Sequence, residues 1–299
     1  MNAARQMNFR GELRMNESLS SYTSWRVGGP ADRLYKPADL EDLSDFLGQL
    51  PSEEPLTWIG LGSNLLVRDG GIRGTVIALQ GQLNGLHRLE DNRVRIESGV
   101  SGAKAARFCA REGLVGLEFL AGIPGTIGGA LAMNAGAFGS ETWERITAVE
   151  TIDHQGKLHH RLPAEFEIGY RTVKGPEGEW FVAAEFELEL GDAEAALLRI
   201  KGLLEKRNAS QPIGSASCGS VFRNPEGDFS GRLIEEAGLK GYCVGQACVS
   251  EKHANFILNQ GGATAADIEA LIHYVQETVK KKSGVTLVPE VRIIGEAVS

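Results

Sequence analysis

The chain has 299 residues, of which 42% are hydrophobic and 23% charged, and its formal net charge is −8. This length favours two domains over a single core, and no apolar run is long enough to cross a bilayer. The acidic balance argues against general nucleic-acid binding, although single arginines can still bind an anionic small molecule. Residues 1–6 lack the apolar centre of a secretory signal, so we expect a cytoplasmic protein.

The first half reads as short strands with two helices. Apolar positions at helical spacing predict a helix over residues 38–49, and small residues predict another over 102–111. Asp91-Asn92 predicts the turn of a hairpin. The expected strands lie at residues 57–60, 65–67, 74–79, 86–90 and 94–98.

Further strands precede a helical C-terminal part. A hairpin is expected at 146–152 and 157–161, and residues 181–190 alternate apolar residues with Glu, as in an edge strand. Helices are expected from Ala193 to about Arg207 and from Ala265 to Lys281, the second with Thr264 as N-cap and Gly284 at its end, before strand-like residues 285–294. We divide the chain into an N-terminal extension (1–20), a first domain (21–191) and a C-terminal domain (192–299).

Residues 122–139 are the most informative segment. They contain six glycines among apolar neighbours, whereas a flexible linker of this glycine content is usually polar. Glycine lets backbone N–H groups approach an anionic ligand closely, so the segment predicts a phosphate or dinucleotide cradle, with a structural tight corner as the alternative. The spacing is neither that of a Walker loop nor that of the Rossmann motif.

Two other segments support a large ligand held by main-chain groups. Gly60-Leu61-Gly62-Ser63-Asn64 follows an apolar run, and residues 23–31 form a third such turn. One loop of this kind is weak support. Three in the first half of one chain favour a ligand-binding domain.

Three polar residues each allow two interpretations. Ser220, in Cys-Gly-Ser-Val-Phe, either presents its hydroxyl to a pocket or bonds its own backbone. Glu290, in an apolar segment expected to be a strand, is either paired, as with Arg292, or held for function. Arg171, directly after Tyr170, is either a ligand for a carboxylate or phosphate or a surface arginine.

The cysteines and histidines predict no metal site. Cys109, Cys218, Cys243 and Cys248 show no Cys-x-x-Cys spacing, so neither a metal nor a disulfide is expected. No histidine accompanies Cys218, which disfavours thiol catalysis.

Together these segments resemble the UDP-N-acetylenolpyruvoylglucosamine reductases, over nearly the full chain. The resemblance implies an α+β fold with a two-part FAD-binding domain of the vanillyl-alcohol-oxidase (PCMH) type and a C-terminal α+β substrate-binding domain. It implies noncovalent FAD, NADPH as co-substrate, and a UDP-sugar substrate reduced for peptidoglycan synthesis, with no nucleic acid or membrane as partner. We expect a monomer.

The resemblance also assigns residues. Arg171 matches the catalytic arginine, Glu290 the carboxylate that works with it, and Ser220 the serine that protonates the substrate carbon next to the one that accepts hydride. The positions that match flavin contacts are Gly60, Gly62, Ser63, Asn64, Gly122, Gly125, Thr126, Gly128 and Gly129. The weaker candidates for substrate binding are Tyr170, Arg207, Asn224 and His253.

The chain departs from the family pattern in two places. Val173 stands where a serine is common, and only a short connection, residues 172–179, follows Arg171, as in the class that lacks an inserted tyrosine-bearing loop. Two alternatives to the reductase remain at this point. One is an oxidase of the same fold that returns electrons to O₂, and the other is a nucleotide-binding module without turnover.

Overall fold

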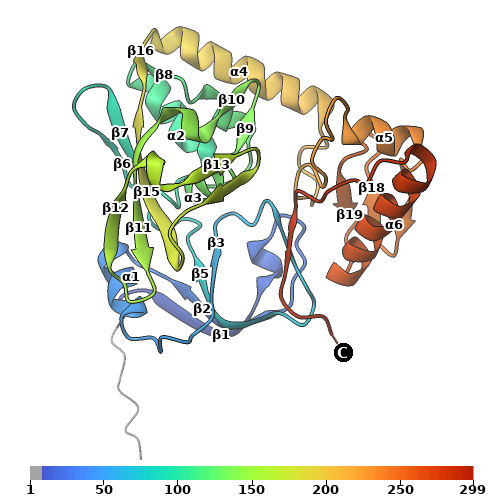
Figure 1. Ribbon diagram of the computed structural model, residues 1–299, viewed down its shortest axis with the longest axis horizontal. Helices are drawn as coiled ribbons and strands as arrows, with labels where there is room; N and C mark the ends of the chain where they lie inside the picture. The colour runs from blue at the N-terminus through green and yellow to red at the C-terminus, as the bar shows by residue number, and fades with distance from the viewer. Residues whose placement is uncertain (1–8, 299) are drawn as a thin grey trace, which may run out of the picture.

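The computed structural model describes residues 9–298, and Figure 1 shows three parts that follow one another along the chain. Residues 1–8, on which the expectation of no secretory signal rests, lie outside the described residues. The first part is a four-stranded sheet in the order β1-β2-β5-β3, with β1 antiparallel and the other pairings parallel. Its elements are β1 (Glu12–Ser18), β2 (Pro30–Lys36), α1 (Leu40–Leu47), β3 (Leu56–Ile59) and β5 (Ile72–Ala78). The strand β1 thus lies within the predicted N-terminal extension.

The second part is a five-stranded antiparallel sheet in the order β12-β11-β15-β7-β6. Its strands are β6 (Leu86–Arg88), β7 (Arg93–Glu97), β11 (Ile146–Asp153), β12 (Leu158–Arg161) and β15 (Glu179–Glu187). Both expected hairpins are confirmed. The prediction of an edge strand at 181–190 is wrong, because β15 lies in the middle of the sheet. Glu185 pairs with Arg93 of the neighbouring strand β7 at 3.1 Å, so a glutamate in this alternation does not by itself mark an edge.

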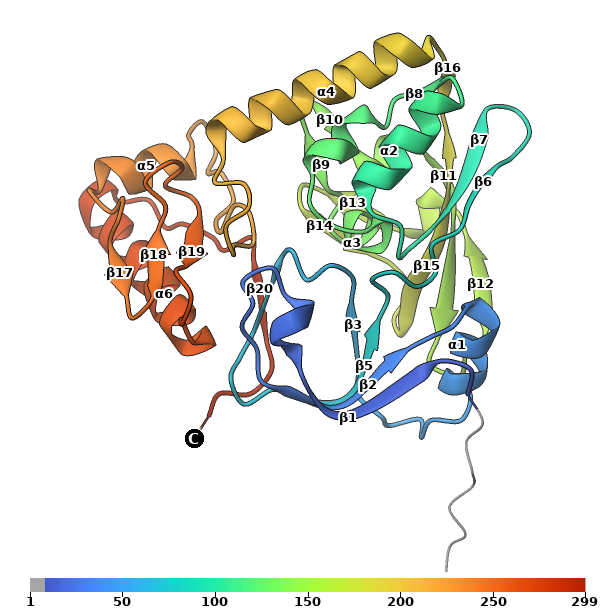
Figure 2. The same cartoon turned by 180° about the vertical axis from the view of Figure 1, so that it is seen from behind.

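Three helices share a hydrophobic core with this second sheet. They are α2 (Gly102–Arg111), α3 (Ile127–Ala132) and α4 (Ala193–Ser210). Of these, α4 lies on the far side of α2 from the sheet. Ala196 and Ile200 of α4 are buried in the same hydrophobic cluster as Val94, Ile96 and Phe186 of the sheet. Figure 2 shows α4 running along this part and ending beside the C-terminal part. This packing places α4 with the second part and favours a domain boundary after α4, near 211. The boundary near 191 is a prediction from the sequence and would assign α4 to the C-terminal domain.

The third part combines two helices with a small sheet. It contains α5 (Ser230–Glu236), β17 (Cys243–Val244), β18 (Ala247–Val249), β19 (Ile257–Asn259) and α6 (Ala265–Ser283). The predicted helix, cap and end of α6 are confirmed: Thr264 Oγ1 accepts from Asp267 N at 3.0 Å, and Gly284 has a φ of 76°. The buried stripe of α6 lies in the core of this part.

The end of the chain returns to its beginning. Of the predicted strand over 285–294, only β20 (Arg292–Ile294) forms, and it pairs in parallel with β4 (Leu65–Val67). Trp25, from the first part, is fully buried in the core of the third. The first and third parts are therefore joined by a strand pair as well as by side-chain packing.

The remaining elements are short. They are η1 (Leu19–Tyr22), β8 (Leu114–Val115), η2 (Glu118–Gly122), β9 (Gly136–Ala137), β10 (Ser140–Glu141), η3 (Thr142–Arg145), η4 (Pro163–Glu165), β13 (Glu167–Gly169), β14 (Thr172–Lys174) and β16 (Glu189–Leu190). Among the helices of residues 9–298, none has the length and apolar character that crossing a membrane requires.

Candidate active site

Two of the glycine loops meet at one place. Ser63 Oγ donates to the carbonyl of Pro124 at 2.6 Å, which ties the 60–64 loop to the 122–129 loop. A Cβ on Gly60 would collide with the hydroxyl of Thr126, and one on Gly62 would collide with the Tyr22 carbonyl. Gly62 also has a φ of 61°, in the region that favours glycine. Only backbone fits at these positions, so main-chain groups form the surface of this loop pair.

These loops also have main-chain donors to offer. Within residues 9–298, the backbone N–H groups of Gly62, Ser63, Asn64 and Gly125 donate to no protein acceptor. A series of free N–H groups on a glycine loop is the arrangement that binds phosphate oxygens. The residues therefore fit the pyrophosphate of a dinucleotide such as FAD.

A cavity of about 580 Å³ opens beside these loops. It is lined by residues of all three glycine turns and by two segments of the C-terminal half, and its lining includes Thr23, Arg26, Leu61, Pro124, Arg207, Ser217 and Gly219. Within the described residues, Arg207 has no carboxylate partner, and its Nε donates to Gln211 at 3.1 Å. The cavity is thus large enough and polar enough for part of a nucleotide.

An ion pair between Arg171 and Glu290 joins two distant parts of the chain. Nε of Arg171 lies 3.1 Å from Oε1 of Glu290, and both side chains are 18% exposed. The N–H of Arg171 Nε does not point at an acceptor, so this contact is electrostatic rather than a directed hydrogen bond. The residues alone left pairing with Arg292 open as one alternative for Glu290. That alternative is not the one found, because Glu290 pairs with Arg171 and Arg292 is exposed at the start of β20.

The Arg171 guanidinium is held by the glycine loop. Arg171 stands in the two-residue turn between β13 and β14, with a φ of 56°. Its Nη2 donates to the Gly136 carbonyl at 2.8 Å, and its Nη1 to that of Asn134 at 3.4 Å. The buried Asn134 amide in turn donates to Glu141 Oε2 at 2.7 Å. The Arg171 guanidinium is thus held in one orientation by two main-chain carbonyls.

Glu290 is fixed through its backbone. Its N–H donates to the Val221 carbonyl at 2.7 Å, and its own carbonyl accepts from Asn64 Nδ2 at 3.1 Å. Burial raises the pKa of Glu290 above its usual range, while the charges of Arg171 and Arg223 oppose that rise. The carboxyl group is therefore largely buried, in contact with one guanidinium, that of Arg171, and within the field of a second, that of Arg223.

Ser220 is linked to this pair through its neighbour in the sequence, Val221. It directly precedes Val221, whose carbonyl receives the Glu290 N–H, and follows Gly219, which has a φ of 69°. Within the described residues the Ser220 hydroxyl has no hydrogen-bond partner, so it does not bond its own backbone. The hydroxyl is therefore free for a ligand.

The four weaker candidates are spread over the surroundings of the site. Tyr170 is half exposed, with its ring 5.2 Å from the Arg171 guanidinium. Asn224 Oδ1 accepts from Ser230 N at 3.1 Å, at the start of α5. His253 packs its ring 4.8 Å from that of Phe256, and burial lowers its pKa. Neither Asn224 nor His253 contacts the Arg171–Glu290 pair.

One basic residue near the pair escaped the sequence analysis. Arg223 directly follows the Cys-Gly-Ser-Val-Phe segment and was given no role. Its proximity to Glu290 depends on a contact between segments 67 residues apart. Sequence reasoning has no local signal for such a contact.

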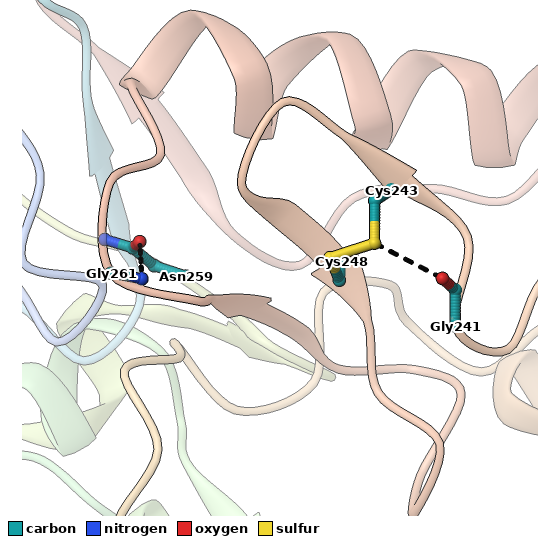
Figure 3. Close-up of a disulfide and its surroundings, with 5 residues drawn as sticks. All are labelled: Gly241, Cys243, Cys248, Asn259 and Gly261. Atoms are coloured by element: carbon teal, nitrogen blue, oxygen red, sulfur yellow. Dashed lines mark hydrogen bonds between the residues drawn. A yellow bond between two sulfur atoms is a disulfide. The ribbon is translucent and has the colours of Figure 1, made fainter.

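The cysteines require a correction. Cys243 and Cys248 are joined in a disulfide across the β17–β18 pair, as Figure 3 shows, with their Cα atoms 4.1 Å apart. Their spacing of five residues hid the pairing, because only the hairpin register places them opposite each other. Cys109 and Cys218 are buried thiols, and burial raises the pKa of each to about 12, which makes them poor nucleophiles. Across residues 9–298 no group of side chains could hold a metal ion.

Comparison with known proteins gives consistent results. The family described as UDP-N-acetylenolpyruvoylglucosamine reductase, C-terminal domain, matches residues 211–294, and the FAD binding domain family matches residues 31–161. The chain is 62% identical over 299 residues, all of both chains, to the UDP-N-acetylenolpyruvoylglucosamine reductase of Alkalilimnicola ehrlichii. It is 61% identical to that of Nitrosococcus oceani, with 96% of each chain covered.

A solved structure is similar as well. The crystal structure of UDP-N-acetylenolpyruvylglucosamine reductase from Thermus caldophilus superposes with a TM-score of 0.80 at 35% identity, covering 96% of this chain and 99% of that one. The expected α+β fold, an FAD-binding domain followed by a C-terminal domain, is confirmed.

Proposed function

Because the chain belongs to the UDP-N-acetylenolpyruvoylglucosamine reductase family, we propose that Arg171, Glu290 and Ser220 carry its reaction. The protein is an FAD-dependent oxidoreductase that uses NADPH to reduce UDP-N-acetylglucosamine enolpyruvate to UDP-N-acetylmuramate for peptidoglycan synthesis. Membership of this family favours a reductase over both an oxidase and a module without turnover.

The Arg171–Glu290 ion pair is the observation that supports this assignment of residues. The two residues lie 119 positions apart, and they meet where the glycine loop, the 60–64 loop and the Ser220 segment converge. A buried ion pair costs desolvation and contributes little to stability, so a functional reason for it is favoured. A carboxylate substrate needs a guanidinium of this kind.

Each residue has a distinct part in the proposed chemistry. The flavin supplies the hydride chemistry, which belongs to the cofactor rather than to the protein. Arg171 binds the enolpyruvyl carboxylate and stabilises the negative charge that develops there as hydride reaches the double bond. Ser220 donates its proton to the adjacent carbon. A serine is a weak acid, so this step requires a strongly basic intermediate, and Glu290 keeps Arg171 oriented beside it.

The glycine loops form the cofactor site in this proposal. Their free N–H groups bind the pyrophosphate, and the matched residues are Gly60, Gly62, Ser63, Asn64, Gly122, Gly125, Thr126, Gly128 and Gly129. Thr126 also caps α3, since its hydroxyl accepts from Gly129 N at 3.5 Å. No cysteine or histidine stands in the 60–64 or 122–139 segments, so FAD is held without a covalent bond.

Substrate binding involves the surroundings of the cavity. Arg207 lines it and has no acidic partner within the described residues, which suits a phosphate of the UDP-sugar. Tyr170, Asn224 and His253 belong to the same proposal as contacts to sugar, phosphate or nicotinamide. We further propose that the enzyme acts in the cytoplasm as a monomer, binding neither nucleic acid nor membrane.

Anaerobic spectroscopy of the purified protein tests the function. The oxidised protein should show a flavin band that bleaches with NADPH and returns on addition of the enolpyruvyl sugar nucleotide. A protein that takes up no FAD, or a reduced flavin that the sugar nucleotide does not reoxidise, would reject the proposal.

A further inference from the structure

Arg223 occupies a fixed position beside the active-site pair. Its backbone N–H donates to the Val288 carbonyl at 2.9 Å, and its carbonyl accepts a hydrogen bond from Ser230 Oγ. The neighbouring Phe222 is buried, and its N–H donates to Asn255 Oδ1 at 2.9 Å. The Arg223 side chain therefore starts from a rigid strand-like segment of the C-terminal part.

The guanidinium reaches across to the turn that carries Arg171. Nη2 of Arg223 donates to the main-chain carbonyl of Arg171 at 3.3 Å. Its Nε is buried, and among residues 9–298 that atom has no hydrogen-bond partner. No carboxylate of the described residues lies within 4.0 Å of the guanidinium, so Arg223 is not neutralised by a direct ion pair.

Two features make the Arg171 turn dependent on such a contact. The turn has only two residues, and Arg171 has a φ of 56°, which costs a non-glycine residue about 1 kcal/mol or more. The contact also crosses from the C-terminal part to the separate β13–β14 hairpin. Glu290 belongs to the same C-terminal part as Arg223. The contact from Arg223 to the Arg171 carbonyl therefore fixes the position of the turn relative to Glu290.

We propose that Arg223 is a positioning residue for the substrate carboxylate site: it clamps the backbone of Arg171 through a hydrogen bond to its carbonyl and adds a second positive charge to the surroundings of the Arg171–Glu290 pair. This inference rests on the proposed function. Arg171 and Arg223 are the charged groups whose fields act on Glu290, and both favour its ionised form. The hydrogen bond from Arg223 to the Arg171 carbonyl and the positive charge of Arg223 together keep the Arg171–Glu290 pair in the orientation that binds a carboxylate.

Three variants separate clamp from charge. Arg223→Gln removes the charge and keeps a shorter donor, Arg223→Lys keeps the charge without the planar fork, and Arg223→Ala removes both. Arg232→Gln, on the exposed face of α5, is the matched control for the loss of one positive charge in the same part. Each holoenzyme is assayed for flavin content, thermal midpoint, flavin reduction by NADPH and reoxidation by the enolpyruvyl sugar nucleotide.

We expect Arg223→Gln to keep its flavin and its NADPH half-reaction within about twofold, and to lose about tenfold or more in reoxidation. The acid limb of its reoxidation rate should move to higher pH, because Glu290 has lost a cation that opposes its protonation. Arg223→Lys should restore the pH profile but only part of the rate, and Arg232→Gln should match the wild type. The dissociation constant of the sugar nucleotide, from its perturbation of the oxidised flavin spectrum, should rise in Arg223→Gln.

A wild-type reoxidation rate and an unmoved acid limb in Arg223→Gln would overturn the inference while leaving the proposed function intact. Equal losses in both half-reactions with a lowered thermal midpoint would also overturn it, because they indicate a structural role only. If Arg223→Gln does not fold, the Arg223→Lys rate and pH profile decide in the same way. Failure of the wild type itself to be reoxidised would instead reject the proposed function.

Discussion

The indole Nε1 of Trp25 donates to the carbonyl of Ile257 at 2.7 Å, 232 residues further along the chain. Trp25 belongs to the glycine turn at residues 23–31, yet its side chain is fully buried in the core of the C-terminal part. The first and third parts of the molecule therefore share a core, and their relative placement, which shapes the cavity between them, depends on this contact.

Trp25→Ala should destabilise the protein by about 3–5 kcal/mol, as expected for removing a buried aromatic side chain. Trp25→Phe keeps most of the apolar volume and loses one hydrogen bond, so its cost should be smaller, although the orphaned Ile257 carbonyl adds to it. Chemical denaturation monitored by circular dichroism gives both values. Equal stability of Trp25→Ala and the wild type would contradict a shared core.

The Arg171–Glu290 pair predicts a stability that depends on pH. Because the folded-state pKa of Glu290 is raised, the native state binds more protons than the unfolded state between the ordinary and the raised value, and stability falls as pH rises through that window. Arg171→Gln removes a cation that limits this effect, so it should cost about 2–4 kcal/mol at neutral pH and less in acid.

The double variant Arg171→Gln/Glu290→Gln is the matched control. Without an ionisable group at residue 290 it should recover most of the lost stability at neutral pH and show no extra loss between acid and neutral pH. Urea denaturation at several pH values measures this. A pH-independent cost of Arg171→Gln would mean that Glu290 does not titrate in the folded protein as described.

Substitution of Gly62 by alanine should cause a selective loss of cofactor binding. A side chain there meets the Tyr22 carbonyl, and the φ of 61° adds strain, so Gly62→Ala should displace the loop that carries the free N–H groups. Gly81→Ala is the matched control, because Gly81 has a φ of 77° but open space around its Cβ position. Gly81→Ala should cost only about 1–2 kcal/mol of backbone strain and keep its flavin. Flavin content after gel filtration distinguishes the two.

Ser220→Ala predicts a split between the two half-reactions. The variant should bind FAD and be reduced by NADPH at the wild-type rate, while reoxidation by the enolpyruvyl sugar nucleotide falls by about 100-fold or more, since the proton donor is absent. Ser210→Ala, at the exposed end of α4, is the control. Stopped-flow absorbance separates the steps, and an unchanged reoxidation rate in Ser220→Ala would assign the proton to another group.

The Cys243–Cys248 disulfide predicts a modest, redox-dependent contribution to stability. It closes a short loop, so reducing it should lower the free energy of unfolding by at most about 2 kcal/mol. Thermal unfolding with and without a thiol reductant tests this, and Cys109→Ser serves as the control because Cys109 is a free buried thiol. Loss of the folded state on reduction would mean that the disulfide contributes far more than its loop length predicts.

The sequence alone predicted the helices α1, α2, α4 and α6 and two hairpin turns, whereas the short helices α3 and α5 were not predicted. The bounds of α2 and both ends of α6 follow from caps, apolar spacing and a terminal glycine, all of which act within a few residues. The glycine loops were recognisable for the same reason. Where no Cβ atom fits, only glycine is tolerated, and the resulting excess of glycine is visible in the sequence. The resemblance to a reductase family rested on these local motifs, and it led to the proposed roles of Arg171, Ser220 and Glu290 before any contact was known.

Only the tertiary structure decided which distant groups meet. The strand β15 lies in the middle of its sheet because it pairs with both β7 and β11. Its alternation of apolar residues with glutamates does not reveal this position, because a central strand can pair a glutamate with an arginine of the next strand. The residues alone left Arg292 open as a partner of Glu290, and the resemblance joined Glu290 to Arg171 by role only; the fold makes the Arg171–Glu290 contact, because a buried charge pairs with the cation that the fold brings to it. The disulfide followed from a hairpin register and the place of Arg223 from a contact between two parts of the chain, and neither is encoded in residue spacing.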